Sequence, residues 1–307
     1  MAMMLELALF AVGLVMLIKG SDLFVEAASR TAKDFGVSEF IIALVLASIA
    51  TTLPEVTVSA LAAYRGESGI ALGNAIGSAL ANIGLILGIS AMIMPLKVDK
   101  TAWENSLFLV AVTGYATLIM RDGVISRVDG FSLIMIYFGF LYYLYRKHMT
   151  IDEVSEREGD PKKDALILLG SGIVVVIGAR LVVNSAVTLA EALGISEAVI
   201  GLTLVSIGTS LPELTNSLTA TLKRIPNISV GNIIGADILD ILMVIGIASL
   251  IRPIQVDSET FSITLPLALL VMVILTVSLR INNKVDRKTA SLFLGIYAYF
   301  IYVLFFR

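Results

Sequence analysis

The sequence predicts an all-α membrane protein of ten transmembrane helices in two inverted five-helix repeats, with the second and seventh helices broken at their middles. Three observations lead to this prediction: the composition, a series of long apolar runs, and a segment that recurs 158 positions later. Of the 307 residues, 57% are hydrophobic and only 15% are charged, and the mean hydropathy is +0.93. Soluble globular proteins are far more polar, so the chain belongs in a bilayer.

Apolar runs of roughly 20 residues are long enough to cross the hydrocarbon core of a membrane. Hydropathy places ten such runs, centred near residues 15, 50, 82, 110, 136, 176, 208, 240, 270 and 297. The first run leads directly into the repeat, which is typical of a retained span and not of a cleaved signal. One clearly hydrophilic connection separates two blocks of five spans. We therefore expect a first repeat over residues 1–146, a loop over 147–163 and a second repeat over 164–307.

The repeat is visible in two motifs. The sequence SIATTLPE at positions 48–55 recurs as SIGTSLPE at 206–213, and GNAIG at 73–77 recurs as GNIIG at 231–235, with the same spacing between the motifs. The correspondence extends to Gly20 with Gly178 and to Pro95 with Pro253. Because five is an odd number, the second block must enter the membrane from the opposite side, which predicts inverted repeats.

The distribution of lysine and arginine predicts the orientation. Loops on one side of the ten-span arrangement carry 15 of these residues and loops on the other side carry 5, while Lys19 and Arg180 lie within spans. Since the richer side is normally cytoplasmic, we expect a cytoplasmic loop over 147–163 and both termini outside, in the cell membrane.

The second and seventh spans each contain a proline at mid-membrane, Pro54 and Pro212. Proline removes a backbone donor and disturbs the preceding turn, so carbonyls near Ser48, Thr51, Ser206 and Thr209 are expected to lack helical partners. Irregular backbone at this depth is tolerated where it lines a cavity or is buried in protein. Freed carbonyls, with the hydroxyls beside them, are hard oxygen ligands for cations.

Carboxylates follow the prolines directly. Glu55 and Glu213 occupy matched positions, and Asn82 and Asp240 each lie 27 residues further on. Buried acids are costly unless they are charge-compensated, so we expect a cation site shared by the two halves. The ligands are all oxygen, with no cysteine and a single histidine in the polar loop, which favours sodium, calcium or magnesium over zinc, copper or iron.

With both motifs present twice at matched spacing, the chain resembles the calcium/cation antiporter superfamily, and its prokaryotic sodium/calcium exchangers in particular, over essentially its full length. The resemblance implies a ten-helix exchanger in which Glu55 and Glu213 bind calcium with the carbonyls of Thr51 and Thr209. It further implies sodium sites that use both glutamates together with Ser48, Thr52, Ser78, Asn82, Ser206, Ser210 and Asp240. It also implies that the first and sixth helices slide across the other eight.

The chain departs from the family pattern at Gly235-Ala236-Asp237, where these exchangers usually read Gly-Ser-Asn. The hydroxyl is lost, and an additional acid appears beside the predicted site. Asp237 is a candidate metal ligand, a candidate proton carrier or a charge that faces water. The proton-coupled branch of the family usually has a glutamate where this chain has Ile76 and Ile234, which favours sodium coupling.

These observations predict a secondary-active antiporter that exchanges Na+ for Ca2+ by alternating access, with electrogenic Ca2+ extrusion. The alternatives are a proton/calcium antiporter that uses Asp237 and, more distantly, a cation channel. An enzyme is not expected, because the spans contain no nucleophile and base pair. We expect no cofactor and no obligatory protein partner, only the two ions and the bilayer, and the net charge of −3 gives no reason to expect a nucleic-acid partner.

Overall fold

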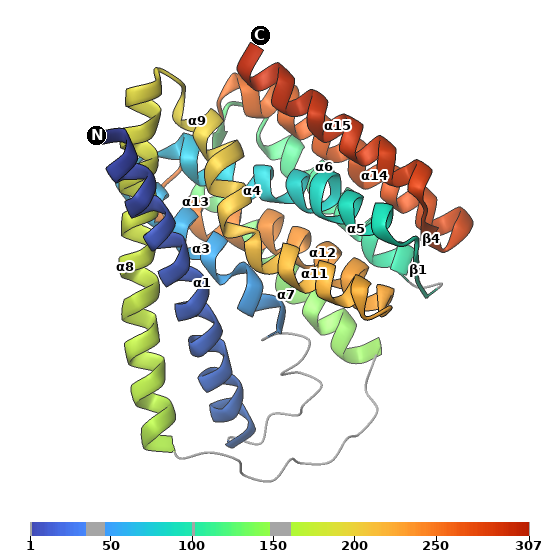
Figure 1. Ribbon diagram of the computed structural model, residues 1–307, viewed down its shortest axis with the longest axis horizontal. Coiled ribbons are helices and arrows are strands. Elements are labelled where there is room, and N and C mark those ends of the chain that lie inside the picture. Colours follow the sequence, from blue (N-terminus) through green and yellow to red (C-terminus); the bar gives the residue numbers. More distant parts are fainter. Residues whose placement is uncertain (1, 35–46, 100–101, 148–160, 307) are drawn as a thin grey trace.

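The computed structural model describes residues 2–34, 47–99, 102–147 and 161–306. Helices make up nearly all of this part, with two short sheets at the loops (Figure 1). In the first half the helical elements are α1 (Ala2–Asp34), α3 (Ala47–Arg65), α4 (Ser68–Ala81), η2 (Asn82–Leu87), α5 (Gly88–Ile93), α6 (Ala102–Ile119) and α7 (Arg127–Lys147).

The second half repeats this order. Its elements are α8 (Pro161–Leu193), α9 (Glu197–Ile200), η3 (Gly201–Val205), α10 (Ser206–Thr209), α11 (Leu211–Leu222), α12 (Pro226–Leu239), η4 (Asp240–Val244), α13 (Ile245–Ile251), η5 (Thr260–Thr264), α14 (Leu265–Asn282) and α15 (Arg287–Phe306). The segments labelled η are π-helical turns, and they join the α-helices around them into continuous rods.

Six of the described helices are long and apolar enough to cross a membrane, and the bent pair formed by α9–α10 and α11 makes a possible seventh. The remaining rods, α3, α6 and α7, carry more polar residues at their ends or middles. For example, α7 begins with Arg127 and Asp129 and ends with Arg146 and Lys147. The prediction of an all-helical membrane protein is confirmed, with six to seven apolar spans in the described residues.

The predicted break in the seventh span is present. Residues Glu197–Thr209 and Leu211–Leu222 meet at an angle of 47°. Ser210 leaves the helical conformation there, with ψ of 11°, and Pro212 lies in the first turn of α11, where its missing N–H costs nothing.

The predicted break in the second span is not found in its described part, residues 47–65. Helix α3 runs without interruption from Ala47 to Arg65 with Pro54 inside it. A proline in a helix interior can be accommodated when neighbouring helices hold the rod in place, and α3 packs against α1, α4, α8 and α13. The same motif therefore bends one rod and not the other.

Two short antiparallel sheets tie the halves together. Strand β1 (Leu96–Lys97) pairs with β4 (Lys284–Val285), and β2 (Val124–Ile125) pairs with β3 (Ile254–Gln255). Each sheet joins one strand from the first half to one from the second. The strands β1 and β3 begin directly after Pro95 and Pro253, which the repeat matches to each other.

The two longest helices, α1 and α8, lie side by side at one edge of the molecule (Figure 1). Glycines permit this close approach, because a Cβ atom on Gly13 would lie 2.9 Å from the carbonyl oxygen of Gly178. Near one end of the pair, Arg30 Nε donates to Asp164 Oδ1 at 2.8 Å, and the Asp164 side chain is only 3% exposed.

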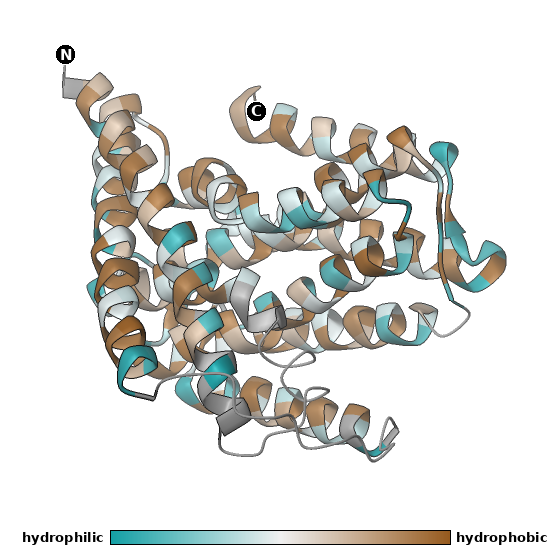
Figure 2. Cartoon of the chain, turned by 60° about the horizontal axis from the view of Figure 1, so that its bottom comes forward, coloured by the Kyte–Doolittle hydropathy of each residue, from teal (hydrophilic) through white to brown (hydrophobic). Residues whose placement is uncertain are grey.

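The rods α4–η2–α5 and α12–η4–α13 form the centre of the molecule. In each of them 78% of the most apolar window is buried, against 28% in α1 and in α15. The outer helices present hydrophobic residues along most of their length (Figure 2). This pattern is that of a bundle whose outer surface faces lipid.

Candidate cation site

Four acidic side chains are buried at the centre of the molecule. Glu55 lies on α3, Glu213 on α11, Asp237 on α12 and Asp240 at the start of η4, and each of the four is at most 1% exposed. Their charges act on one another: Asp240 interacts electrostatically with the other three, and Glu213 with Glu55 and Asp237. No lysine or arginine is buried within the described ranges. The structure thus brings together the acids that the sequence predicted.

The hydroxyls of each repeat face the glutamate of the other. Ser210 Oγ donates to Glu55 Oε1 at 3.3 Å, and Thr209 also lies near the Glu55 carboxylate. In the same way, Thr51 of the first half lies beside the carboxylate of Glu213 in the second half. This crossed arrangement makes each glutamate part of a site built by both halves.

Asn82 and Asp240 occupy matched places in the backbone. Each is the first residue of a π-helical turn, η2 for Asn82 and η4 for Asp240, and each is 1% exposed. A π turn inserts one extra residue into a helix and changes the direction of the side chains around it, and such turns are frequent at functional sites. The sequence motifs gave no signal for these turns. Asn82 Nδ2 donates to Asp237 Oδ1 at 3.0 Å.

Asn74 joins three elements around the acids. Its Nδ2 donates to the carbonyl oxygen of Glu55 at 3.2 Å and to Ser59 Oγ at 2.9 Å, and its Oδ1 accepts from Thr209 Oγ1 at 2.9 Å. These bonds brace α4 against α3 and α10. Its counterpart Asn232 behaves differently, because its buried Nδ2 finds no hydrogen-bond partner in the described part of the chain.

Many oxygen atoms around the acids have no hydrogen-bond partner among the described residues. Eight buried atoms share this property: Thr52 Oγ1, Glu55 Oε2, Asn82 Oδ1, Glu213 Oε1 and Oε2, Asp237 Oδ2, and Asp240 Oδ1 and Oδ2. Buried polar atoms are normally satisfied, since leaving one unpaired costs about 1–3 kcal/mol and more if it is charged. A set composed of oxygen alone matches the coordination preferences of sodium and calcium.

No three acids in the described residues converge closely enough to hold a metal ion by themselves. A cation bound here would therefore also need amide, hydroxyl or carbonyl oxygens, as the family resemblance implies for Thr51, Thr52, Asn82, Thr209 and Ser210.

Other predicted ligands have protein partners here. Ser206 Oγ donates to the carbonyl oxygen of Leu202 at 2.8 Å, and Ser78 Oγ donates to the carbonyl oxygen of Ser206 at 3.4 Å. The Thr209 hydroxyl also contacts the carbonyl oxygen of Val205, at 3.2 Å. The side chain of Ser48 lies outside the described residues. Ion contact for this group stays a prediction.

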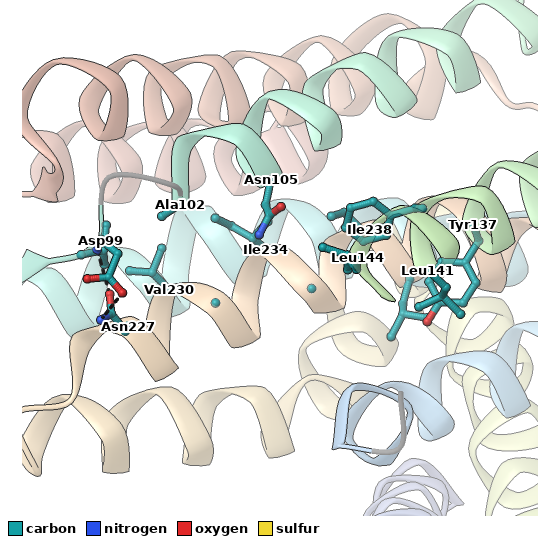
Figure 3. Close-up of a pocket in the computed structure, with 15 residues that line it drawn as sticks. Asp99, Ala102, Asn105, Tyr137, Leu141, Leu144, Asn227, Val230, Ile234 and Ile238 are labelled. Atoms are coloured by element: carbon teal, nitrogen blue, oxygen red, sulfur yellow. Dashed lines mark hydrogen bonds between the residues drawn. The ribbon is translucent and has the colours of Figure 1, made fainter. Parts of the chain in front are cut away.

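A separate cavity of about 260 Å³ lies between α6, α7 and α12 (Figure 3). At one end Asn227 Nδ2 donates to Asp99 Oδ2 at 3.0 Å, and near the other end Ile238 and Leu239 line the wall. None of the four buried acids lines this cavity. The four acids are instead buried by protein outside this cavity.

The sequence is similar to a known protein family and to individual membrane proteins. The family model described as "Sodium/calcium exchanger protein" matches residues 5–146 and 163–306. The chain is 37% identical over 297 residues to an uncharacterized membrane protein of Methanocaldococcus jannaschii, with 96% of each chain covered. It is 31% identical over 338 residues to the sodium/calcium exchanger MaX1 of Methanosarcina acetivorans, covering 96% of this chain and 97% of MaX1.

The fold is similar to that of a solved exchanger. The structure of the sodium-calcium exchanger NCX_Mj soaked with Na+ and Sr2+ aligns with a TM-score of 0.69 at 35% identity, covering 99% of this chain and all of that one. The family match spans nearly the whole sequence, and the buried acids lie within it. The chain is a multi-pass membrane protein that belongs to the sodium/calcium exchanger protein family.

Proposed function

We propose that this protein is a secondary-active antiporter that exchanges Na+ for Ca2+ across the membrane by alternating access. The observation that carries the proposal is the group of buried acids, contributed by both halves, that is lined by unpartnered oxygens and has no buried lysine or arginine among the described residues. Such a group is stable only when cations compensate its charge. The protein has a transport role and not an enzymatic one, as its family indicates.

The proposed calcium site consists of the Glu55 and Glu213 carboxylates with the carbonyls of Thr51 and Thr209. Sodium ions use the same carboxylates, so the two cations compete for them, and this competition couples their movements. The further sodium ligands that we propose are Ser48, Thr52, Ser78, Asn82, Ser206, Ser210 and Asp240. Without bound cations the carboxylates repel one another in a low-dielectric space. The protein without bound ions therefore changes poorly between its two access states. No cofactor is required, since both cations are substrates.

We also propose that the ten helical rods are ten spans in two inverted repeats, with boundaries at 1–146 and 164–307 around a cytoplasmic loop at 147–163. The matched positions support this proposal: π turns begin at Asn82 and Asp240, and β1 and β3 begin 158 residues apart. The excess of lysine and arginine on one side supports outward-facing termini in the cell membrane.

The two halves differ in detail, and this difference supports alternating access. Asn74 bonds Glu55, Ser59 and Thr209, whereas its counterpart Asn232 and the counterpart of Ser59, Ser217, each have an unpartnered polar atom within the described residues. In an inverted-repeat transporter, access changes sides when one repeat or bundle moves against the other around a fixed site, so the contacts between the halves change. We therefore expect Asn232 to form the equivalent bonds in the opposite state.

Gradient-driven transport tests the function. Purified protein in liposomes is given 45Ca2+ under an imposed sodium gradient and, separately, under an imposed pH gradient. We expect uptake with the sodium gradient alone, and an inside-positive potential should change its rate if the exchange is electrogenic, as we propose.

Two other outcomes would contradict the proposal. Uptake driven by the pH gradient alone would identify a proton/calcium antiporter, for which buried Asp237 is the candidate carrier. Uptake that responds to neither gradient, only to calcium itself, would indicate a channel.

A further inference from the structure

Asp237 is an acid that the internal repeat does not explain. The position that corresponds to it in the first half is Ala79, and the neighbouring position has Ser78 in the first half but Ala236 in the second. Asp237 is nevertheless fully buried, at 0% exposure. Since Asp237 does not face water, its carboxyl group either carries a proton or has its negative charge compensated from within the protein or by a ligand.

Only one of the two carboxylate oxygens of Asp237 has a hydrogen-bond partner among the described residues. Oδ1 accepts from Asn82 Nδ2 at 3.0 Å, while Oδ2 has no hydrogen-bond partner among the described residues. Asp240 follows three positions later on the same helical face, and neither of its oxygens is partnered in that part of the chain. The side-chain nitrogen of Asn82 makes the bond to Asp237, and the side-chain oxygen of Asn82, Oδ1, is also unpartnered among the described residues.

The buried carboxylates need positive charge to balance them. A neutral amide donor cannot offset a buried carboxylate, and like charges at i and i+3 on a helix destabilise it. The charge of Asp237 acts directly on Glu213 and Asp240. Within the described residues no buried lysine or arginine relieves this repulsion. When all four carboxylates are ionised, four monovalent cations balance their charge.

We propose that Asp237 binds sodium. Together with Asp240 and the side-chain oxygen of Asn82, Oδ1, it holds one sodium ion, and the site would bind one sodium ion fewer if Asp237 were absent. Only four unpartnered oxygens lie on these three residues, fewer than the 6–8 that calcium takes, so the three residues do not form a calcium site by themselves. This inference rests on the proposed function and specifies the sodium load of the same site.

Equilibrium binding of 22Na+ to the purified protein in detergent, without calcium, tests the proposal. Asp237→Asn keeps an acceptor for the Asn82 amide and removes the charge, and Asp237→Ala removes both. We expect both variants to lose one bound sodium ion per chain at saturation. Asp22→Asn is the matched control, since Asp22 is an exposed acid on α1, and it should bind as many sodium ions as the wild type. Thermal unfolding in the same detergent identifies variants that fail to fold.

Two results would overturn the proposal. If Asp237→Asn binds as many sodium ions as the wild type, the carboxylate is not a sodium ligand. If only Asp237→Ala loses an ion, Asp237 serves to position Asn82. Sodium-driven 45Ca2+ uptake by the wild type is measured in parallel. Absence of that uptake would count against the proposed function, while the difference in sodium number would still decide the role of Asp237.

Discussion

At the scale of single residues, the proposed site is centred on Glu55 and Glu213, which are separated by 158 positions in the chain and interact electrostatically in the fold. Both are 1% exposed, and Ser210 from the second half donates to Glu55. Burial removes the hydration that normally stabilises a carboxylate, so a bound cation becomes its main stabilising partner. We therefore expect the charge compensation of these carboxylates by bound cations to determine when the protein can transport.

Replacing Glu213 with glutamine keeps the shape of the side chain and removes its charge. Loss of one partner from a buried charge pair costs about 3–5 kcal/mol, which corresponds to a loss of at least about 100-fold in Ca2+ affinity. We expect Glu213→Gln, and likewise Glu55→Gln, to abolish sodium-driven 45Ca2+ uptake in proteoliposomes. Glu191→Gln, at an exposed position on α8, should transport normally. Unchanged uptake by the Glu213 variant, with normal thermal unfolding, would exclude this residue from the site.

At the scale of the elements, identical motifs have different outcomes in the two halves. Pro54 lies inside the continuous helix α3, while Pro212 begins α11 after a bend of 47°. The glycines of the central rods show the same asymmetry. A Cβ on Gly73 would lie 2.9 Å from the carbonyl oxygen of Ala198, whereas a Cβ on its counterpart Gly231 meets nothing within 4 Å. Local sequence is therefore not what decides whether a rod packs closely.

This asymmetry gives a matched pair of variants. Gly73→Ala places a methyl group against the backbone of η3 and α9, and overpacking of this kind costs about 1–3 kcal/mol. Gly231→Ala enters open space and gains helix propensity of about 1 kcal/mol. We expect a lower thermal unfolding temperature for Gly73→Ala and an equal or higher one for Gly231→Ala. Equal destabilisation of the two would show that both glycines are packed alike.

At the scale of the whole molecule, the helices α1 and α8 form a pair at one edge of a bundle centred on α4–α5 and α12–α13. Gly13 and Gly178 allow their close contact, and the Arg30 to Asp164 ion pair joins them near one end. Both helices belong to the apolar spans, and most of their surface is exposed on the outside of the bundle. How this arrangement is oriented in the membrane follows from the charges of the loops.

The orientation can be tested directly because the sequence contains no cysteine. Single cysteines at Arg121 and at Lys163, both exposed, report on opposite predicted sides. In intact cells a membrane-impermeant maleimide should label Arg121→Cys, while Lys163→Cys should react only after permeabilisation. The reverse labelling pattern would invert the proposed topology, and labelling of both in intact cells would contradict the ten-span arrangement.

Much of the candidate site could be predicted from the sequence because the repeat and the buried acids are local signals. Glu55, Glu213 and Asp240 stand out as acids within apolar runs, and Pro212 marks a bend that the structure confirms. Other features gave no such signal. No motif marks the π turns that begin at Asn82 and Asp240, and α3 continues as a helix through Pro54 while it packs against α1, α4, α8 and α13.

The sequence by itself determined that the chain is a membrane protein with a duplicated motif and acidic residues at matched positions, because hydropathy and spacing are properties of the linear chain. Only the tertiary structure decided that Asp237 faces the other acids, that Asn82 bonds to it, and that Asn74 is bonded while Asn232 has an unpartnered amide nitrogen among the described residues. These facts depend on contacts between residues distant in sequence. Such contacts form only when the two halves pack together, so the repeat can predict two equivalent halves but cannot show how they differ.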